Sequence, residues 1–205
     1  MGMKIAIHQP EHFPYAGFFQ KMEACDVFVI LDDVQFTKNN FQNRNRFLNT
    51  NGVEEWFTVP VPSNANSLLI KDIVITDKSN WRKKLCQKVL QNLKIDISEV
   101  YEASNNLCQI NVDSIEFIRK KLDIKTPMVF SSELNVEGNK SEKLLNICKK
   151  LSANCYISGK GGIEYLDVGI FNHEGIKIEF HQSKLKDYYT TLSHLKDYEH
   201  LCDIP

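Results

Sequence analysis

Short apolar runs at both ends of the chain alternate with segments whose apolar residues repeat at helical spacing. Residues 4–8 and 26–31 are nearly continuous apolar runs, which is typical of parallel strands covered on both faces. Between them, at 15–25, the apolar side chains repeat at helical spacing at Phe18, Met22 and Cys25. Strand, loop, helix and strand within about thirty residues predict a βαβ unit.

The same alternation returns after Pro127. It predicts strands at 128–132, 155–159 and 176–181, a helix at 140–151 and a short helix at 163–171. Ser141 is a plausible start for the longer helix, because serine side chains cap helix N-termini well.

The middle of the chain has a different pattern. Asn51-Gly52 between two β-like segments predicts a hairpin over 41–61, and the alternation at 68–76 predicts a further strand. Apolar residues at helical spacing predict helices at 80–93 and 111–122.

We therefore expect one α/β domain over 1–205 with three layers and a mostly parallel sheet, nucleotidyltransferase-like or Rossmann-like in arrangement. A polar, β-rich hairpin insertion occupies about 37–76 and a helical segment about 79–123.

Composition and charge narrow the classes of function. The chain is 42% hydrophobic and 25% charged, with a formal net charge of -1, so bulk electrostatics give no reason to expect nucleic acid or membrane binding. No apolar run approaches the ~20 residues that span a bilayer, and no secretory signal is visible. We expect a cytoplasmic protein that binds a small molecule, with no nucleic acid partner and no membrane insertion.

The six cysteines show no C-x-x-C spacing. Most lie in apolar segments, so we expect reduced, buried thiols and no zinc site.

Polar side chains follow the first two predicted strands. His8, Gln9, His12 and Tyr15 come after the first, and Asp32, Asp33 and Gln35 after the second. Because ligand sites of open α/β sheets lie beyond the carboxyl ends of the strands, both groups are predicted to reach one edge. The N-terminus of the helix near Tyr15 would add an anion site there.

Each group also has a simpler interpretation. His8 is a candidate general acid or base or a phosphate contact, and Asp32 and Asp33 are candidate ligands for Mg²⁺ on phosphate. Alternatively, the aspartates only end a strand, and His12 is a solvated loop residue beside prolines.

A second polar cluster lies in the predicted hairpin: Lys38, Gln42, Asn43, Arg44, Asn45 and Arg46. A strand over 41–48 would place Gln42, Arg44 and Arg46 on one face, and the asparagines on the other. Lysine and arginine bind phosphate or carboxylate, and side-chain amides bind hydroxyls, so these residues suit a small anionic substrate.

A glycine-rich third cluster follows a predicted strand: Ser158, Gly159, Lys160, Gly161 and Gly162. Glycines let backbone amides approach a phosphate closely, which makes this a candidate nucleotide-binding loop. The alternative is an ordinary glycine-rich turn from strand to helix.

At these clusters the sequence resembles the WbqC-like protein family. The resemblance rests on "IAIHQPEHFPYAGFFQKMEACDVFVILDDVQFTKNNFQNRNRF", "WFTVPV" and "CYISGKGGIEYLD", and it reaches to about residue 180. His12 departs from the asparagine associated with the family, and the C-terminal end lacks the leucine-rich, glycine-terminated ending.

The resemblance implies an association with O-antigen and other surface-polysaccharide gene clusters, and an aminoacyl (glycyl) transfer to an amino sugar. It places a site at the following residues: His8, Gln9, Asp32, Asp33, Gln35, Gln42, Asn43, Arg44 and Arg46.

Two hypotheses of function follow. The first is a transferase that acts on a nucleotide-linked amino sugar through an adenylate, with ATP and Mg²⁺ as cofactors and His8, Asp32 and Asp33 as catalytic residues. The alternative is a non-catalytic sugar-nucleotide-binding or scaffolding protein of the same pathway. Nucleic acid binding is a third, weaker hypothesis, based on the aromatic neighbours of Arg44 and Arg46.

Overall fold

The computed structural model describes residues 2–76, 79–183, 185, 187–197, 200–201 and 204. The chain divides into two compact units. The first takes its described residues from 1–9, 17–32 and 125–184, and the second from 10–16, 33–124 and 185–205. The single-domain organisation stays a prediction.

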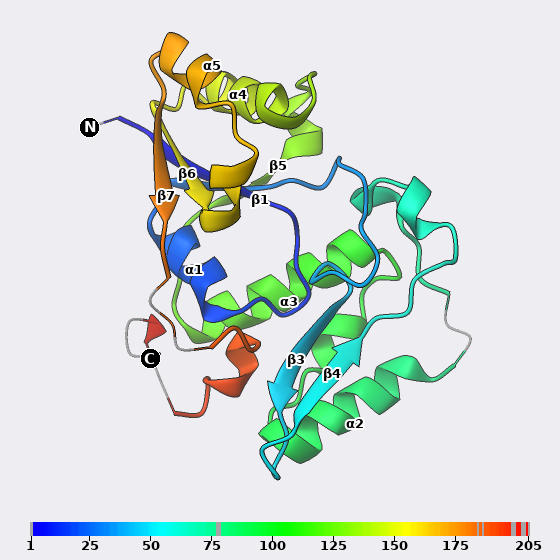
Figure 1. The fold of residues 1–205 in the computed structure, drawn as a ribbon. Coiled ribbons are helices and arrows are strands. Elements are labelled where there is room, and N and C mark those ends of the chain that lie inside the picture. Colours follow the sequence, from blue (N-terminus) through cyan, green and yellow to red (C-terminus); the bar gives the residue numbers. More distant parts are fainter. Residues whose placement is uncertain are drawn as a thin grey trace. The chain divides into compact units, whose positions relative to one another are not determined.

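The first unit contains a five-stranded parallel sheet (Figure 1). Its strands are β1 (Lys4–His8), β2 (Val27–Ile30), β5 (Met128–Phe130), β6 (Cys155–Gly159) and β7 (Lys177–His181), in the order β5-β2-β1-β6-β7. The predicted α/β class and mostly parallel sheet are therefore confirmed.

Helices cover both faces of this sheet (Figure 1). Helices α4 (Lys140–Lys150) and α5 (Val168–His173) pack on the face that carries Ile5 and Ile7, in one buried cluster. Helix α1 (Ala16–Glu23) packs on the other face, where the rings of Phe18 and Phe28 lie 5.0 Å apart. The predicted three layers follow from this alternation of side chains along each strand.

The second unit combines a hairpin with two helices. Strands β3 (Arg44–Leu48) and β4 (Glu54–Thr58) pair antiparallel, as the Asn-Gly signal predicts. Helices α2 (Trp81–Leu93) and α3 (Leu107–Lys121) confirm the helical middle. The short 3₁₀ helices are η1 (Ala65–Ser67), η2 (Ile70–Asp72), η3 (Ser98–Tyr101) and η6 (Thr191–Ser193) here, with η4 (Ser131–Leu134) and η5 (Lys160–Glu164) in the first unit.

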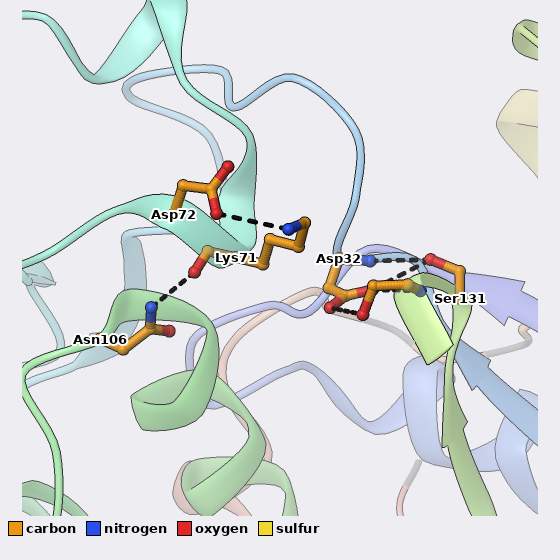
Figure 2. A network of polar contacts seen from close by, with 6 residues as sticks. Asp32, Lys71, Asp72, Asn106 and Ser131 are labelled. Atoms are coloured by element: carbon orange, nitrogen blue, oxygen red, sulfur yellow. Dashed lines mark hydrogen bonds and ion pairs between the residues drawn. The ribbon is translucent and has the colours of Figure 1, made fainter. Parts of the chain in front are cut away.

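The strand predicted at 68–76 is wrong. This segment contains η2 and makes single bridges at Leu69 and Val74 in place of a ladder. Ile70 and Ile73 are both fully buried, because a 3₁₀ turn brings residues three apart onto one side. The carbonyl of Lys71 in this turn accepts a hydrogen bond from the side chain of Asn106 at 2.6 Å (Figure 2).

Two smaller predictions about helix ends are also wrong. Helix α4 begins one residue before Ser141, after Asn139, and the Ser141 hydroxyl instead accepts the backbone N–H of Asp167 at 3.0 Å. The helix predicted at 163–171 is two elements, η5 and α5, because the carboxylate of Asp167 accepts from Gly169 N–H and starts a new helix.

Five of the cysteines are free thiols, namely Cys25, Cys86, Cys108, Cys148 and Cys155. Burial raises the pKa of the Cys25 thiol to about 11 and that of Cys148 to about 12, so neither supplies a thiolate nucleophile. Cys202 lies outside the described residues. No helix in the described part of the chain is long and apolar enough to cross a membrane.

Candidate functional site

The predicted site residues are divided between the two units. His8, Gln9, Asp32 and the 158–162 segment belong to the first unit. The other predicted residues belong to the second: His12, Tyr15, Asp33, Gln35, Lys38, Gln42, Asn43, Arg44 and Arg46. That all of them serve one site stays a prediction.

Asp32 is held by two serines at the end of β5 (Figure 2). Its Oδ1 accepts the Ser131 hydroxyl at 3.0 Å and the Ser132 backbone N–H at 3.0 Å, and its Oδ2 accepts the Ser132 hydroxyl at 2.7 Å. The side chain is buried, with 4% of its residue surface exposed. This carboxylate caps the turn that follows β5, which is the simpler of the two interpretations of the sequence.

Few ligand atoms are available for a metal ion at Asp32. A carboxylate offers about four lone-pair positions, and the serines occupy three of those of Asp32. No group of three or more His, Cys, Asp or Glu side chains is placed to hold a metal ion within the described ranges. The arrangement therefore supports a structural role for Asp32 and adds nothing to the prediction of bound Mg²⁺.

His8 ends β1 as a neutral imidazole. Burial, followed by the positive charge of Lys21, lowers the pKa of His8 to about 3. Its Nδ1 lies 3.0 Å from the carbonyl oxygen of Gln9, and a carbonyl can only accept, so Nδ1 carries the hydrogen and Nε2 is the basic nitrogen. In the empty protein the ring is therefore neutral, which favours a neutral contact or a proton acceptor over a charged phosphate contact.

Gly159 on β6 pairs with His181 on β7, and His8 is the last residue of the neighbouring strand β1. A Cβ built at Gly159 meets nothing within 4 Å, so there is open space beside this glycine. Lys21 on α1 is buried, and its charge helps to lower the pKa of both His8 and His181. This end of the sheet therefore has room for a ligand group beside Gly159.

The rest of the glycine-rich segment is explained by packing. Ser158 is 1% exposed and its hydroxyl donates to the carbonyl of Gly159 at 3.2 Å. A Cβ on Gly162 would lie 2.1 Å from the Ser158 Oγ, so glycine is required there by close approach. Lys160 and Gly161 are exposed. The turn interpretation accounts for Ser158 and Gly162, and nucleotide binding by the segment stays a prediction.

A hollow of about 1000 Å³ lies elsewhere in the first unit, between α4 and α5. None of the predicted residues lines it. Lys149 and Glu174 in its wall form an ion pair at 2.9 Å, so each charge is largely compensated by the other.

In the second unit, most of the predicted amides support the backbone. Gln42 Oε1 accepts the N–H of Thr37 at 3.0 Å, and Asn43 Nδ2 donates to the carbonyl of Val59 at 3.1 Å. Both side chains are about 2% exposed. Within the polar sequence at 39–46, these two buried amides therefore hold the backbone in place, and neither is presented to a ligand.

A second group of amides fixes the loop at 10–16. Asn45 donates to the carbonyls of His12 at 3.2 Å and Phe13 at 2.8 Å. Asn111 on α3 donates to the carbonyls of Pro10 at 3.0 Å and Gln42 at 2.7 Å. These bonds, with the hydroxyl of Ser114 accepting from Phe13 N–H at 2.9 Å, hold Phe13 at its positive φ of 44°.

His12 is a core residue, which overturns the expectation of a solvated loop histidine. It has no exposed surface, and its ring lies 5.0 Å from that of Phe13 and 5.5 Å from that of Phe57. Its Nε2 is 3.0 Å from the hydroxyl of Tyr101. Burial lowers the pKa of His12 to about 3, so it stays neutral.

The two predicted arginines have different surroundings. Arg46 pairs with Glu54 at 3.0 Å, and its guanidinium lies 5.5 Å from the ring centre of Trp56. Arg44 lies 4.3 Å over the same ring and, among the residues that the structure describes, makes no side-chain hydrogen bond or ion pair. Arg44 is therefore a guanidinium that is oriented by stacking and available to an anion.

The remaining predicted residues lie at or near the surface of the second unit. Gln35 donates to the carbonyl of Asn66 at 2.6 Å, and the backbone N–H of Lys38 donates to Asn66 Oδ1 at 2.9 Å. Asp33 is partly buried. Tyr15 is partly buried beside Tyr188, and burial raises its pKa to about 12, so it remains a neutral phenol.

Comparison with known proteins adds the family. The model of the WbqC-like protein family matches residues 9–200. The chain belongs to this family. The match continues through most of the C-terminal segment, beyond residue 180, where the sequence alone showed no resemblance.

One relative of this WbqC-like protein is the uncharacterized protein Rv1507c of Mycobacterium tuberculosis (strain ATCC 25618 / H37Rv). It is 29% identical over 198 residues, which cover 90% of this chain and 85% of the relative. No solved structure matches the chain significantly.

Four side chains that shape these regions of the WbqC-like chain were not predicted from the sequence. They are Lys21, Trp56, Asn111 and His181. Asn111 and Lys21 lie at helix positions that the apolar pattern assigns to the buried face. A polar residue there needs a buried partner, so its presence in the pattern could have identified both. Trp56 and His181 gave no comparable signal.

Proposed function

We propose that this protein acts in surface-polysaccharide (O-antigen) biosynthesis and transfers an aminoacyl group, such as glycyl, to the amine of a nucleotide-linked amino sugar. The gene clusters and glycyl transfer implied by the family resemblance support the pathway and the reaction. The chemistry of the second unit supports the class of ligand.

The observation that carries the proposal is the guanidinium of Arg44. Its Cζ lies over the ring of Trp56, 4.3 Å from the ring centre, while the neighbouring Arg46 is paired with Glu54. A planar guanidinium fixed in this way can offer two parallel N–H donors to a phosphate, as a nucleotide-linked sugar requires.

The reaction needs an activated carboxyl group, which ATP would supply. The carboxylate oxygen of the amino acid attacks the α-phosphorus of ATP, and pyrophosphate leaves. The sugar amine then attacks the acyl carbon, AMP leaves with the electron pair of the broken C–O bond, and the amine loses a proton.

Mixing the protein with ATP, Mg²⁺, glycine and a nucleotide-linked amino sugar tests the proposal. We expect pyrophosphate release that requires glycine, and a glycylated sugar nucleotide detectable by mass spectrometry. Absence of pyrophosphate release with every amino acid tried, with and without the sugar nucleotide, would overturn the adenylate route.

A second candidate is a non-catalytic protein that binds the sugar nucleotide. The hydrogen bonds of Asp32 favour it, because both oxygens of this predicted catalytic carboxylate accept from the hydroxyls of Ser131 and Ser132. Under this candidate, calorimetry would show sugar-nucleotide binding that Arg44→Ala weakens, while no product forms under any condition.

A further inference from the structure

One face of the β3–β4 hairpin brings both predicted arginines against the same tryptophan. Arg46 on β3 pairs with Trp56 on β4 in the strand register, and Arg44 lies two residues from Arg46 on the same face. The Cζ of Arg44 is 4.3 Å from the ring centre of Trp56, and that of Arg46 is 5.5 Å from it. The position of this indole therefore bears on the position of both guanidinium groups.

Glu54 holds the indole from the next position on this face of β4. One of its carboxylate oxygens accepts the indole N–H of Trp56 at 3.2 Å, and the other pairs with Arg46 Nη1 at 3.0 Å. Because Arg46 also lies over the indole, the three side chains form a closed set of contacts. Side chains locked by their neighbours in this way hold the geometry of a site.

The environment of Arg46 strengthens this arrangement. Its guanidinium lies 5.7 Å from the ring centre of Tyr189, and its backbone carbonyl accepts the N–H of Thr190 at 3.0 Å. Glu54 compensates its charge. Arg44, which has no carboxylate partner in the described part of the chain, is therefore the guanidinium of this face that remains for an anion.

We propose that Glu54 is a positioning residue of the Arg44 site and gives the site its preference for a sugar-linked diphosphate over a free nucleoside diphosphate. This inference rests on the proposed function, in which a phosphate of the sugar nucleotide binds Arg44. Glu54 acts through its neighbours: it orients Trp56, on which Arg44 lies, and it keeps Arg46 neutralised.

The preference follows from charge. A free nucleoside diphosphate ends in a phosphate that gains a further negative charge above its second pKa of ~6, whereas a sugar-linked phosphate is a diester and has no such proton to lose. The carboxylate of Glu54, in contact with the same indole as Arg44, repels the extra charge. The free diphosphate carries no sugar amine to accept an acyl group, so rejecting it keeps the site open for the substrate.

Calorimetry with UDP-N-acetylglucosamine and UDP, at a pH of about 8 where the UDP terminus is fully ionised, tests the charge of Glu54. Glu54→Gln keeps an oxygen that can accept the indole N–H and removes the charge. We expect this variant to strengthen the binding of UDP about fivefold more than the binding of UDP-N-acetylglucosamine, because the repulsion acts mainly on the extra charge.

Glu55→Gln is the matched control, because it removes the same charge one residue along β4. The side chain of Glu55 lies on the opposite face of the strand, where it pairs with Lys88 at 3.0 Å. The ratio of the two affinities should therefore keep its wild-type value in this variant.

Glu54→Ala tests the contact with the indole. Trp56 and Trp81 are the two tryptophans of the chain, so Trp56→Phe assigns the two indole signals of a ¹H–¹⁵N spectrum. Loss of the acceptor should move the Trp56 signal upfield in Glu54→Ala, while Glu54→Gln should leave it near its wild-type position.

The outcomes separate this inference from the proposed function. If UDP-N-acetylglucosamine binds but the affinity ratio is the same in Glu54→Gln as in the wild type, or changes equally in Glu55→Gln, the role of Glu54 in the preference is overturned and the proposed ligand class stands. An unmoved Trp56 signal in Glu54→Ala overturns the positioning of the indole. If the wild-type chain binds neither nucleotide, the inference and the proposed ligand class both fail.

Discussion

The two units use polar residues in opposite ways. In the first, apolar packing holds the parallel sheet, and polar side chains such as His8 and His181 lie at the ends of the strands, where there is open space beside Gly159. In the second, buried amides such as Asn45 and Asn111 bind the backbone of loops. A polar cluster in a sequence can therefore belong to a site or to a scaffold, and the hydrogen-bond partners decide which.

The sharpest test of this comparison is Asn111→Ala in the second unit. Its side chain bonds two buried carbonyls, those of Pro10 and Gln42, and each would lose its donor. We expect the free energy of unfolding to fall by about 3 kcal/mol, measured by urea titration, because a buried unsatisfied group costs ~1–3 kcal/mol.

Gln109→Ala on the same helix is the control for this variant. Gln109 is exposed and bonds Asp113 four residues on, a pair worth about 0.2–0.5 kcal/mol. Equal losses in the two variants would show that the amide network of the second unit does not carry its stability.

In the first unit, Asp32→Ala tests whether its carboxylate is scaffold or site. Ser132 would lose an acceptor for both its N–H and its hydroxyl, so we expect a loss of about 2 kcal/mol in the free energy of unfolding. Unchanged stability with a lost response to Mg²⁺, followed by thermal shift, would instead make Asp32 a metal ligand.

The buried histidine of the second unit predicts a pH dependence. His12 has a pKa of about 3 when folded and ~6.5 when unfolded, so between these values the unfolded chain binds a proton that the folded chain does not. The free energy of unfolding should therefore fall with falling pH, by up to ~1.4 kcal/mol per pH unit from this residue.

His12→Gln isolates that contribution, because it keeps a polar partner for Tyr101 and removes the titration. Urea titrations at pH 7, 6, 5 and 4 should give a shallower slope for the variant. The same slope in both proteins would mean that His12 gains a proton in the folded state as readily as in the unfolded one.

The smallest expected change in stability is at Arg44. Arg44→Lys should alter the free energy of unfolding by less than ~0.5 kcal/mol, since the side chain makes a single stacking contact at the surface. It should weaken sugar-nucleotide binding about tenfold by calorimetry, because an ammonium cannot offer two parallel donors.

Arg46→Lys is its counterpart, since an ion pair with Glu54 survives that change. If Arg46→Lys weakens binding as much as Arg44→Lys, the distinction between the available and the paired arginine fails.

The parallel sheet was predictable because β1 and β2 come from nearly continuous apolar runs, which are typical of strands covered on both faces. The strand expected at 68–76 failed because isoleucines three apart suit a 3₁₀ turn as well as a strand. Residue types also suggested His8, Asp32 and Arg44 as candidate site residues. They did not indicate the protonation of His8 or the contacts of Asp32 and Arg44. The neutrality of His8, the serines around Asp32 and the placement of Arg44 over Trp56 depend on contacts with residues distant in sequence.

The contact of Gly162 with Ser158 bears on how this family can vary. A methyl group at 162 would collide with the hydroxyl at 158, so the two positions cannot change independently. A relative with a side chain at 162 should have lost the bulk at 158, or have moved the turn after β6. Correlated changes at positions 158 and 162 in other members of the family would then indicate that their turn after β6 has the same backbone.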